Sequence, residues 1–168
     1  MYTYEIKTSI DFLKKLLDER EDFLKNPLSS RYAINCALTA WHLHEWVYSE
    51  YKSHPAIQPF KTLNEFRKHY FDKSEIILLR DLADGSKHFQ LNRASKEVVF
   101  TTVVPKGQKF GSREVKEPFL SVVTKLGNTN LHMAFNDLLN LAVDFWYGFF
   151  RNTLGVIDID DVFVGYSP

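Results

Sequence analysis

The sequence is poor in cysteine: its 168 residues contain one, Cys36. A single thiol excludes an intramolecular disulfide framework and favours a reducing compartment, so we expect a cytoplasmic protein. The first residues lack a basic segment followed by an apolar one, which argues against a secretory signal peptide. No run of 18 apolar residues is present. We therefore expect neither a transmembrane span nor a membrane partner.

An excess of charge of either sign is also missing, since 21 Lys and Arg residues balance 21 Asp and Glu residues. This balance argues against a main role in non-specific binding to nucleic acid or anionic membranes. The chain has no Gly-rich phosphate loop, no dinucleotide-binding fingerprint and no Gly-x-Ser-x-Gly motif, which excludes the commonest nucleotide-binding and hydrolase classes by motif. The length and the 45% hydrophobic content predict one globular domain over residues 1–168.

Apolar residues recur at helical spacing in five segments. They predict helices at about residues 9–25, 30–52, 63–71, 75–93 and 137–152. Capping residues stand before all five: Thr8 or Ser9, Ser29 or Ser30, Thr62 with Glu65 as a capping box, Ser74, and Asn136. Residues rich in β-branching predict strands at about 97–104, 118–124 and 130–135. The expected fold is mainly α, a bundle of four to five helices with a small antiparallel β-meander inserted before the last helix.

The helix predicted at 30–52 is apolar almost all the way round, which is typical of a buried central helix. It nevertheless carries a polar stripe, composed of Arg31, Asn35, Thr39, His42, Trp46 and Ser49, with Glu45 at its margin. Because buried polar groups need hydrogen-bond partners, another element must supply them. The helix predicted at 75–93 presents Asp81, Asp84 and His88 on one face. We therefore expect these two helices to share a polar cluster, which also includes Lys87.

Three interpretations of this cluster are open. In the first interpretation, the cluster is a structural network in the core whose polar atoms are all hydrogen-bonded, and Asp84 orients His88. Alternatively, it binds a divalent metal ion through His42, Glu45, Asp84 and His88, which lie at i, i+3 and i, i+4 spacings. The third interpretation is acid–base chemistry without a metal, with His88 as base or acid, Asp84 orienting it, and Arg80 or Lys87 supplying positive charge.

The segments NCALTAWHLHEWVY and RDLADGSKHFQL, followed by strands and by VDFWYGFF, resemble a group of uncharacterised bacterial and phage helical proteins. Those proteins carry a His-x-x-acidic-Trp pattern, which His42, Glu45 and Trp46 match here. They also carry Asp-x-Ala-Asn-Gly-x-Lys-His-Phe, which is matched by Asp81, Ala83, Gly85, Lys87, His88 and Phe89, with Asp84 in place of Asn. The resemblance covers residues 31–151 and supports the fold, but it implies no function that can be named.

A weaker resemblance is to HEPN domains, helical bundles of prokaryotic defence and toxin systems, some of which are metal-independent ribonucleases. Their signature separates Arg from His by four to six residues, whereas seven residues separate Arg80 from His88. This resemblance implies a HEPN-like bundle in an accessory or defence context. The departure from the signature puts ribonuclease activity in doubt.

Three further features concern partners. Lys106, Lys109 and Arg113 flank Phe110, which makes them candidates for nucleic-acid contact, with a solvated hairpin tip as the alternative. The acidic segment near the C-terminus, with Asp158, Asp160 and Asp161, has a charge opposite to that of this basic loop. Attraction between the two segments would support self-association.

Five aromatic residues among positions 145–150 surround the last helix. They cannot all face one core, so we expect a homodimer through that helix.

The expected function is a non-enzymatic helical interaction module with a protein partner. Two alternatives remain: a metal-independent ribonuclease using His88 with Asp84 and Arg80, and a metal-binding bundle. They differ in what they require. A nuclease needs His88 in a positively charged groove, a metal site needs converging ligands, and an interaction module needs an exposed apolar patch.

Overall fold

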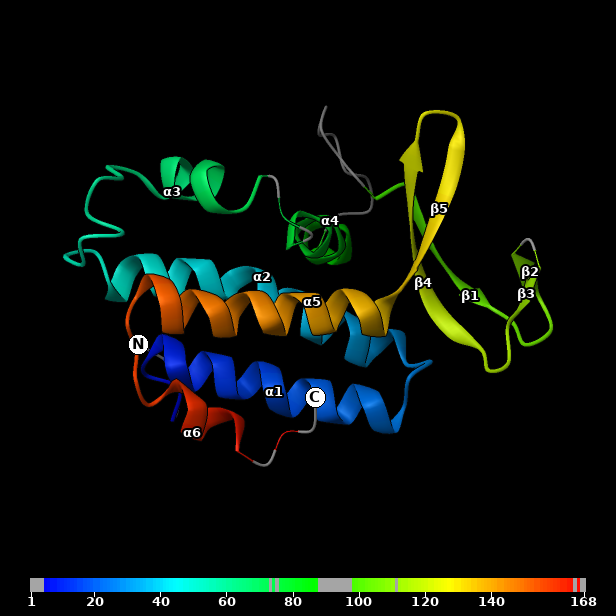
Figure 1. Ribbon diagram of the computed structural model, residues 1–168, viewed down its shortest axis with the longest axis horizontal. Helices are drawn as coiled ribbons and strands as arrows, with labels where there is room; N and C mark the ends of the chain where they lie inside the picture. The colour runs from blue at the N-terminus through cyan, green and yellow to red at the C-terminus, as the bar shows by residue number, and fades with distance from the viewer. Residues whose placement is uncertain are drawn as a thin grey trace.

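The computed structural model describes residues 5–72, 74, 76–87, 98–110, 112–164 and 166 (Figure 1). Its helices are α1 (Ser9–Lys25), α2 (Ser30–Glu50), α3 (Leu63–Tyr70), α4 (Ile76–Lys87), α5 (Phe135–Gly148), the π-helical turn η1 (Phe149–Thr153) and α6 (Ile159–Phe163). Its strands are β1 (Phe100–Val104), β2 (Lys109–Phe110), β3 (Arg113–Glu114), β4 (Phe119–Leu126) and β5 (Thr129–Ala134). The predicted fold class is confirmed: the chain is mainly α, with a small β-meander before the last helices.

Local capping explains where several helices begin. Thr8 accepts a hydrogen bond from the Asp11 amide, and the Asp11 carboxylate accepts from the Thr8 amide, which forms a capping box. The predicted capping box of Thr62 and Glu65 opens α3 in the same way. The prediction that Asn136 caps the last helix is wrong, because α5 begins at Phe135, one residue before Asn136. The Asn136 Oδ1 atom is buried and has no hydrogen-bond partner among the described residues.

The helices α1, α2 and α5 run alongside one another, and α4 crosses α2 and is seen nearly end-on in Figure 1. The side chains between them form the core, which includes Leu13, Leu43 and Trp146 at 0% exposure. The Trp146 indole N–H donates to the Ala40 carbonyl at 3.0 Å, so the largest core side chain also satisfies its polar atom. The contact between α2 and α4 is the one on which the predicted polar cluster depends.

The aromatic residues of the last helix find partners within the chain. Trp146, Phe149 and Phe150 are buried, and Phe145 lies against Phe71 with ring centroids 5.5 Å apart. The Tyr147 ring meets Phe163 of α6 edge-on at 5.0 Å. The π-helical turn η1 continues α5 through this aromatic segment. The homodimer through the last helix stays a prediction, and these intramolecular contacts supply much of the cover for which it was invoked.

Residues 98–134 form a β-structured appendage, here called the arm, that stands at one end of the bundle (Figure 1). Its sheet has the order β1-β4-β5 and is antiparallel throughout. Val122 packs against the helical core, and Val104 and Val123 are also buried. A second hairpin, β2–β3, occupies the predicted loop between the first two strands, where no strand was expected. The segment 88–97, which includes the predicted end of the fourth helix, lies outside the described residues.

None of the helices in the described part of the chain is both long enough and apolar enough to span a membrane.

Candidate functional site

Among the described residues, the polar side chains of α2 contact two neighbouring helices, α1 and α3. The cluster predicted between α2 and α4 includes His88 and stays a prediction. Thr39 is buried, and its hydroxyl receives a hydrogen bond from Lys15 of α1 at 2.6 Å. The Trp46 ring stacks on Phe12, also of α1, with centroids 5.0 Å apart. Arg31, Asn35 and Ser49 are exposed. The polar stripe therefore faces α1 and solvent over much of its length.

The other end of the stripe forms an ion-pair network with α3. The Arg67 guanidinium donates from Nη2 to Glu45 Oε1 at 2.9 Å. The His42 Nδ1–H donates to the same oxygen at 3.3 Å. The hydrogen bond from His42 and the nearby positive charge of Arg67 lower the pKa of the Glu45 carboxyl below its ordinary value, against the effect of its partial burial. His42 and Glu45 are thus brought together as predicted, with Arg67 as a third member.

His44 is a further member of this network, and neither His44 nor Arg67 is among the residues predicted from the sequence. The His44 side chain is fully buried; its Nδ1–H donates to the Trp41 carbonyl, and its Nε2 accepts from Arg67 Nε. These two partners define the neutral tautomer, since one ring nitrogen donates and the other accepts. Burial lowers the pKa of His44 to about 4. Arg67 also lies over the Trp41 ring, at 5.5 Å from its centroid.

The spacing of α2 contains the signal that would have found His44. Ala37, Ala40 and Val47 are buried, and position 44 falls between the last two at helical spacing. A histidine at such a position must be neutral and hydrogen-bonded. Arg67 had no comparable signal, because α3 is joined to α2 by a long connection and its approach depends on the fold.

On α4, Asp81 is buried and holds the arm. Its Oδ1 accepts from Arg80 Nε and Nη2 at 3.1 and 3.0 Å, and its Oδ2 accepts from the Val98 amide at 3.1 Å. Asp84 is half-buried one turn along the helix. The side chain of Lys87 and the whole of His88 lie outside the described residues. The roles predicted for His88 as base or ligand therefore stay predictions.

Of the four predicted metal ligands, the structure brings His42 and Glu45 together. Within the described ranges, no group of three or more His, Cys, Asp or Glu side chains is arranged to hold a metal ion. Glu45 already accepts from Arg67 and His42, so binding a cation there would compete with an existing ion pair. The four-residue divalent site, which requires His88, stays a prediction.

The nucleic-acid contact candidates lie on the β2–β3 hairpin and do not share one face. Phe110 pairs with Arg113 across the strands, so these two side chains point to the same side. Lys109 pairs with Glu114 on the opposite side, and Lys106 forms an ion pair with Glu117 at 3.6 Å. The Phe110 ring lies against His132 of β5, with centroids 5.1 Å apart. The hairpin is therefore basic, but two of its four candidate residues lie beside carboxylates.

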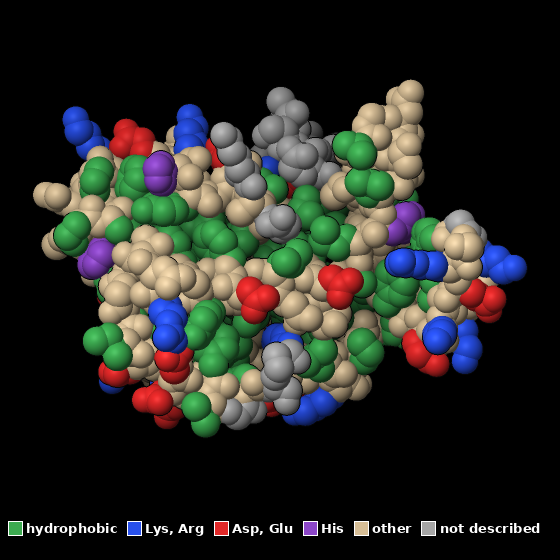
Figure 2. All heavy atoms as spheres, in the orientation of Figure 1, with side chains coloured by type: hydrophobic (Ala, Val, Ile, Leu, Met, Phe, Trp, Pro, Cys, Tyr) green, Lys and Arg blue, Asp and Glu red, His purple; other side chains and the backbone are tan. Residues whose placement is uncertain are grey.

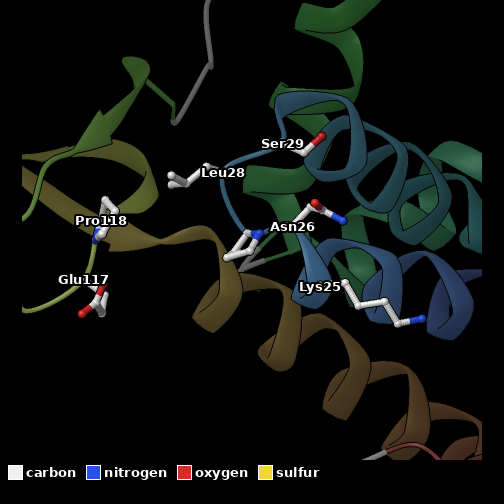
Figure 3. A pocket seen from close by; sticks show the side chains of 7 residues that line it. Lys25, Asn26, Leu28, Ser29, Glu117 and Pro118 are labelled. Atoms are coloured by element: carbon white, nitrogen blue, oxygen red, sulfur yellow. The ribbon is translucent and has the colours of Figure 1, made fainter.

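A hollow of about 540 Å³ opens where the arm meets the bundle (Figure 3). It is lined by Lys25, Asn26, Pro27, Leu28 and Ser29 from the α1–α2 turn and by Glu117 and Pro118 from the arm. Figure 3 shows Leu28 projecting from the turn toward the side of Pro118. None of the predicted site residues lines this hollow.

Comparison with family models, with curated proteins and with solved structures found no match.

Proposed function

We propose that this protein is a non-enzymatic interaction module that binds a protein partner through the arm. The observation that carries this proposal is the exposure of large apolar side chains on the arm. They are Val99, Phe100, Val103, Phe110, Leu126 and Leu131, which are 37–69% exposed. By strand register, Val103, Leu126 and Leu131 lie on one face of the β1-β4-β5 sheet, and exposed apolar groups that share a face are typical of a surface that another protein covers. Figure 2 shows green side chains along the arm, beside its basic tip.

Charge supports a protein partner over nucleic acid. The arm carries five Lys or Arg residues and two Glu residues. Two of the basic residues lie beside those carboxylates, as described above. Such a surface offers few free phosphate contacts, whereas each phosphate contact adds to the affinity of a nucleic-acid binder. An acidic protein surface with apolar side chains matches the arm better.

The bundle supports a non-enzymatic role through the residues that are already engaged. Asp81 fixes Arg80 and the start of the arm, and Glu45 is shared by Arg67 and His42. These contacts fix helix register and the attachment of the arm. A metal-independent ribonuclease with His88, Asp84 and Arg80 is the second candidate, and it is favoured by the packing of α4 on α2.

The test compares an arm variant with a matched control. In Val103→Ser/Leu131→Ser two exposed apolar residues of the arm are replaced, and in Leu24→Ser/Ile34→Ser two similarly exposed residues of the bundle. Each tagged protein is incubated with native extract to which untagged copies of this chain are added, and bound proteins are quantified by mass spectrometry. We expect a protein that the wild type and the control retain equally and the arm variant loses by tenfold or more.

Retention that is the same for all three proteins would contradict the proposal. Cleavage of a labelled RNA in the presence of a chelator, abolished by His88→Ala, would establish the ribonuclease instead.

A further inference from the structure

The zero net charge of this chain conceals two regions of opposite sign. The arm has five basic and two acidic residues, and residues 135–168 have five Asp residues and one Arg. Opposite charges that lie on separate surfaces of one chain attract between copies when they cannot meet within a copy. Whether two copies can make such contacts depends on where the basic and the acidic surfaces lie and on which side chains surround them.

The basic surface is the tip of the arm. Arg113 and Phe110 share one side of the β2–β3 hairpin, and Phe110 is 37% exposed. Lys109 and Lys106 lie on the same short hairpin and its approach, beside Glu114 and Glu117, and the basic residues outnumber these two carboxylates. Figure 2 shows several blue side chains, with red ones among them, at the right-hand end of the molecule. This surface therefore combines positive charge with an exposed aromatic ring.

The acidic surface lies around α6. Asp158 and Asp161 are exposed, whereas Asp160 is held by Arg151 and Tyr147. The two flanking residues, Ile157 and Val164, are 87% and 78% exposed, more than any other large apolar side chain among the described residues. This surface combines negative charge with exposed aliphatic groups, which complements the arm tip in both respects.

Contacts with the bundle fix the acidic surface in place. Ile159 of α6 is fully buried, and the Tyr166 hydroxyl donates to Asp18 of α1 at 2.8 Å. Figure 1 places α6 at the lower left, below α1, and the β2–β3 hairpin at the far right, on the other side of the bundle. The two surfaces therefore cannot pair within one copy.

We propose that copies of this chain associate head to tail, with the basic hairpin of one copy docked on the α6 surface of the next. This inference rests on the proposed function, since it names the partner of the arm as a second copy. Contact between two different surfaces is heterologous and leaves one free surface of each kind at the ends. Association therefore continues beyond the dimer, to open chains or closed rings. Both surfaces are small and exposed, so the association is weak and is reduced by salt.

The experiment is sedimentation velocity of the full chain with charge-reversal variants. In low salt, we expect the wild-type mass to rise from one chain at about 5 µM to an average of at least two chains at about 500 µM, and to fall back at about 300 mM salt. The hairpin variant Lys109→Glu/Arg113→Glu and the α6 variant Asp158→Lys/Asp161→Lys should each remain monomeric. The control Lys52→Glu/Lys61→Glu, with the same change in charge at exposed sites elsewhere, should associate like the wild type.

Mixing the two variants gives the sharpest result. The wild-type surfaces of the two variants complement each other, and so do their reversed surfaces, so an equimolar mixture should regain the association that each variant alone has lost. A chain carrying all four reversals should again form assemblies longer than dimers. A monodisperse wild-type monomer at 500 µM in low salt would overturn the inference, as would a wild-type dimer that neither variant disrupts.

These failures are separable from failure of the proposed function. If the wild type is monomeric but the arm still retains a different protein in the capture experiment, head-to-tail association is wrong and the interaction module stands. If the arm retains neither another protein nor a copy of this chain, both proposals are wrong.

Discussion

His44 ties the electrostatics of the candidate site to the stability of the fold. Its ring is neutral because one nitrogen donates to the Trp41 carbonyl and the other accepts from Arg67. A protonated ring would lose the bond from Arg67 and place two positive charges side by side. The folded state therefore resists protonation of this residue, and its pKa falls from 6.5 to about 4.

This shift predicts a loss of stability in mild acid. Between pH 6.5 and 4 the unfolded chain binds a proton at residue 44 and the folded chain does not, so the free energy of unfolding decreases as the pH falls through this range. The contribution is fully present above pH 6.5 and amounts to at most about 3 kcal/mol. Urea unfolding at several pH values measures it.

The control for His44 is His44→Gln, whose side chain amide keeps an acceptor for Arg67 and does not titrate. Every other ionisable residue is the same in both proteins, so the difference between the two pH profiles isolates residue 44. We expect the variant to be less stable than the wild type at pH 7.5 and to have the shallower profile. Parallel profiles for the two proteins would contradict the assignment.

At the level of elements, Asp81 connects α4 to the arm. Its buried carboxylate accepts from the Val98 amide just before β1 and from Arg80 of its own helix. We expect Asp81→Ala to lower the free energy of unfolding by about 1–3 kcal/mol, because the part-buried Val98 amide and Arg80 guanidinium lose this acceptor. Asp81→Asn keeps an acceptor and should cost less. Thermal and chemical unfolding of both variants measure the order.

The matched control is Asp72→Ala, at an exposed aspartate. Its stability should stay within about 0.5 kcal/mol of the wild type. If Asp81→Ala were as stable as this control, the carboxylate would not anchor the arm.

The same elements show how far the sequence specifies the structure. The helix starts at Thr8 and Thr62 were predictable, because a cap depends only on the N-cap residue and its neighbours up to three positions later. The two-residue strands β2 and β3 were not, because they are too short to show any alternation. The Asn136 cap was wrong because the strand β5 leads directly into α5 at Phe135, and this junction depends on the sheet.

In the described part of the candidate site, the predicted contact is the one between residues on the same helix. His42 and Glu45 are three positions apart on α2 and meet as their spacing indicates. The contact of Glu45 with Arg67 joins residues 22 positions apart. Hydrophobic periodicity shows which face of a helix is buried, but it does not show which neighbour lies against that face.

At the level of the whole molecule, the bundle and the arm differ in how their cores are built. The bundle buries side chains from α1, α2, α4 and α5. The main sheet of the arm has three strands, and its two outer edges pair with no other strand among the described residues. Segments with few buried contacts open locally, at lower free energy than global unfolding. The arm should therefore exchange its amide hydrogens faster than α1, α2 and α5.

Two core substitutions test whether these parts open separately. Leu43→Ala removes a fully buried side chain from the bundle and should cost about 2–5 kcal/mol, which speeds exchange in α1, α2 and α5 by roughly 30-fold or more. Val123→Ala removes buried methyl groups from β4 and should speed exchange within the arm alone. Hydrogen exchange followed by mass spectrometry resolves both regions. If Val123→Ala sped exchange equally in α2 and in β4, the arm and the bundle would open as one unit. An arm that opens alone can adjust to a partner while the bundle stays folded, which is the behaviour that an interaction module requires.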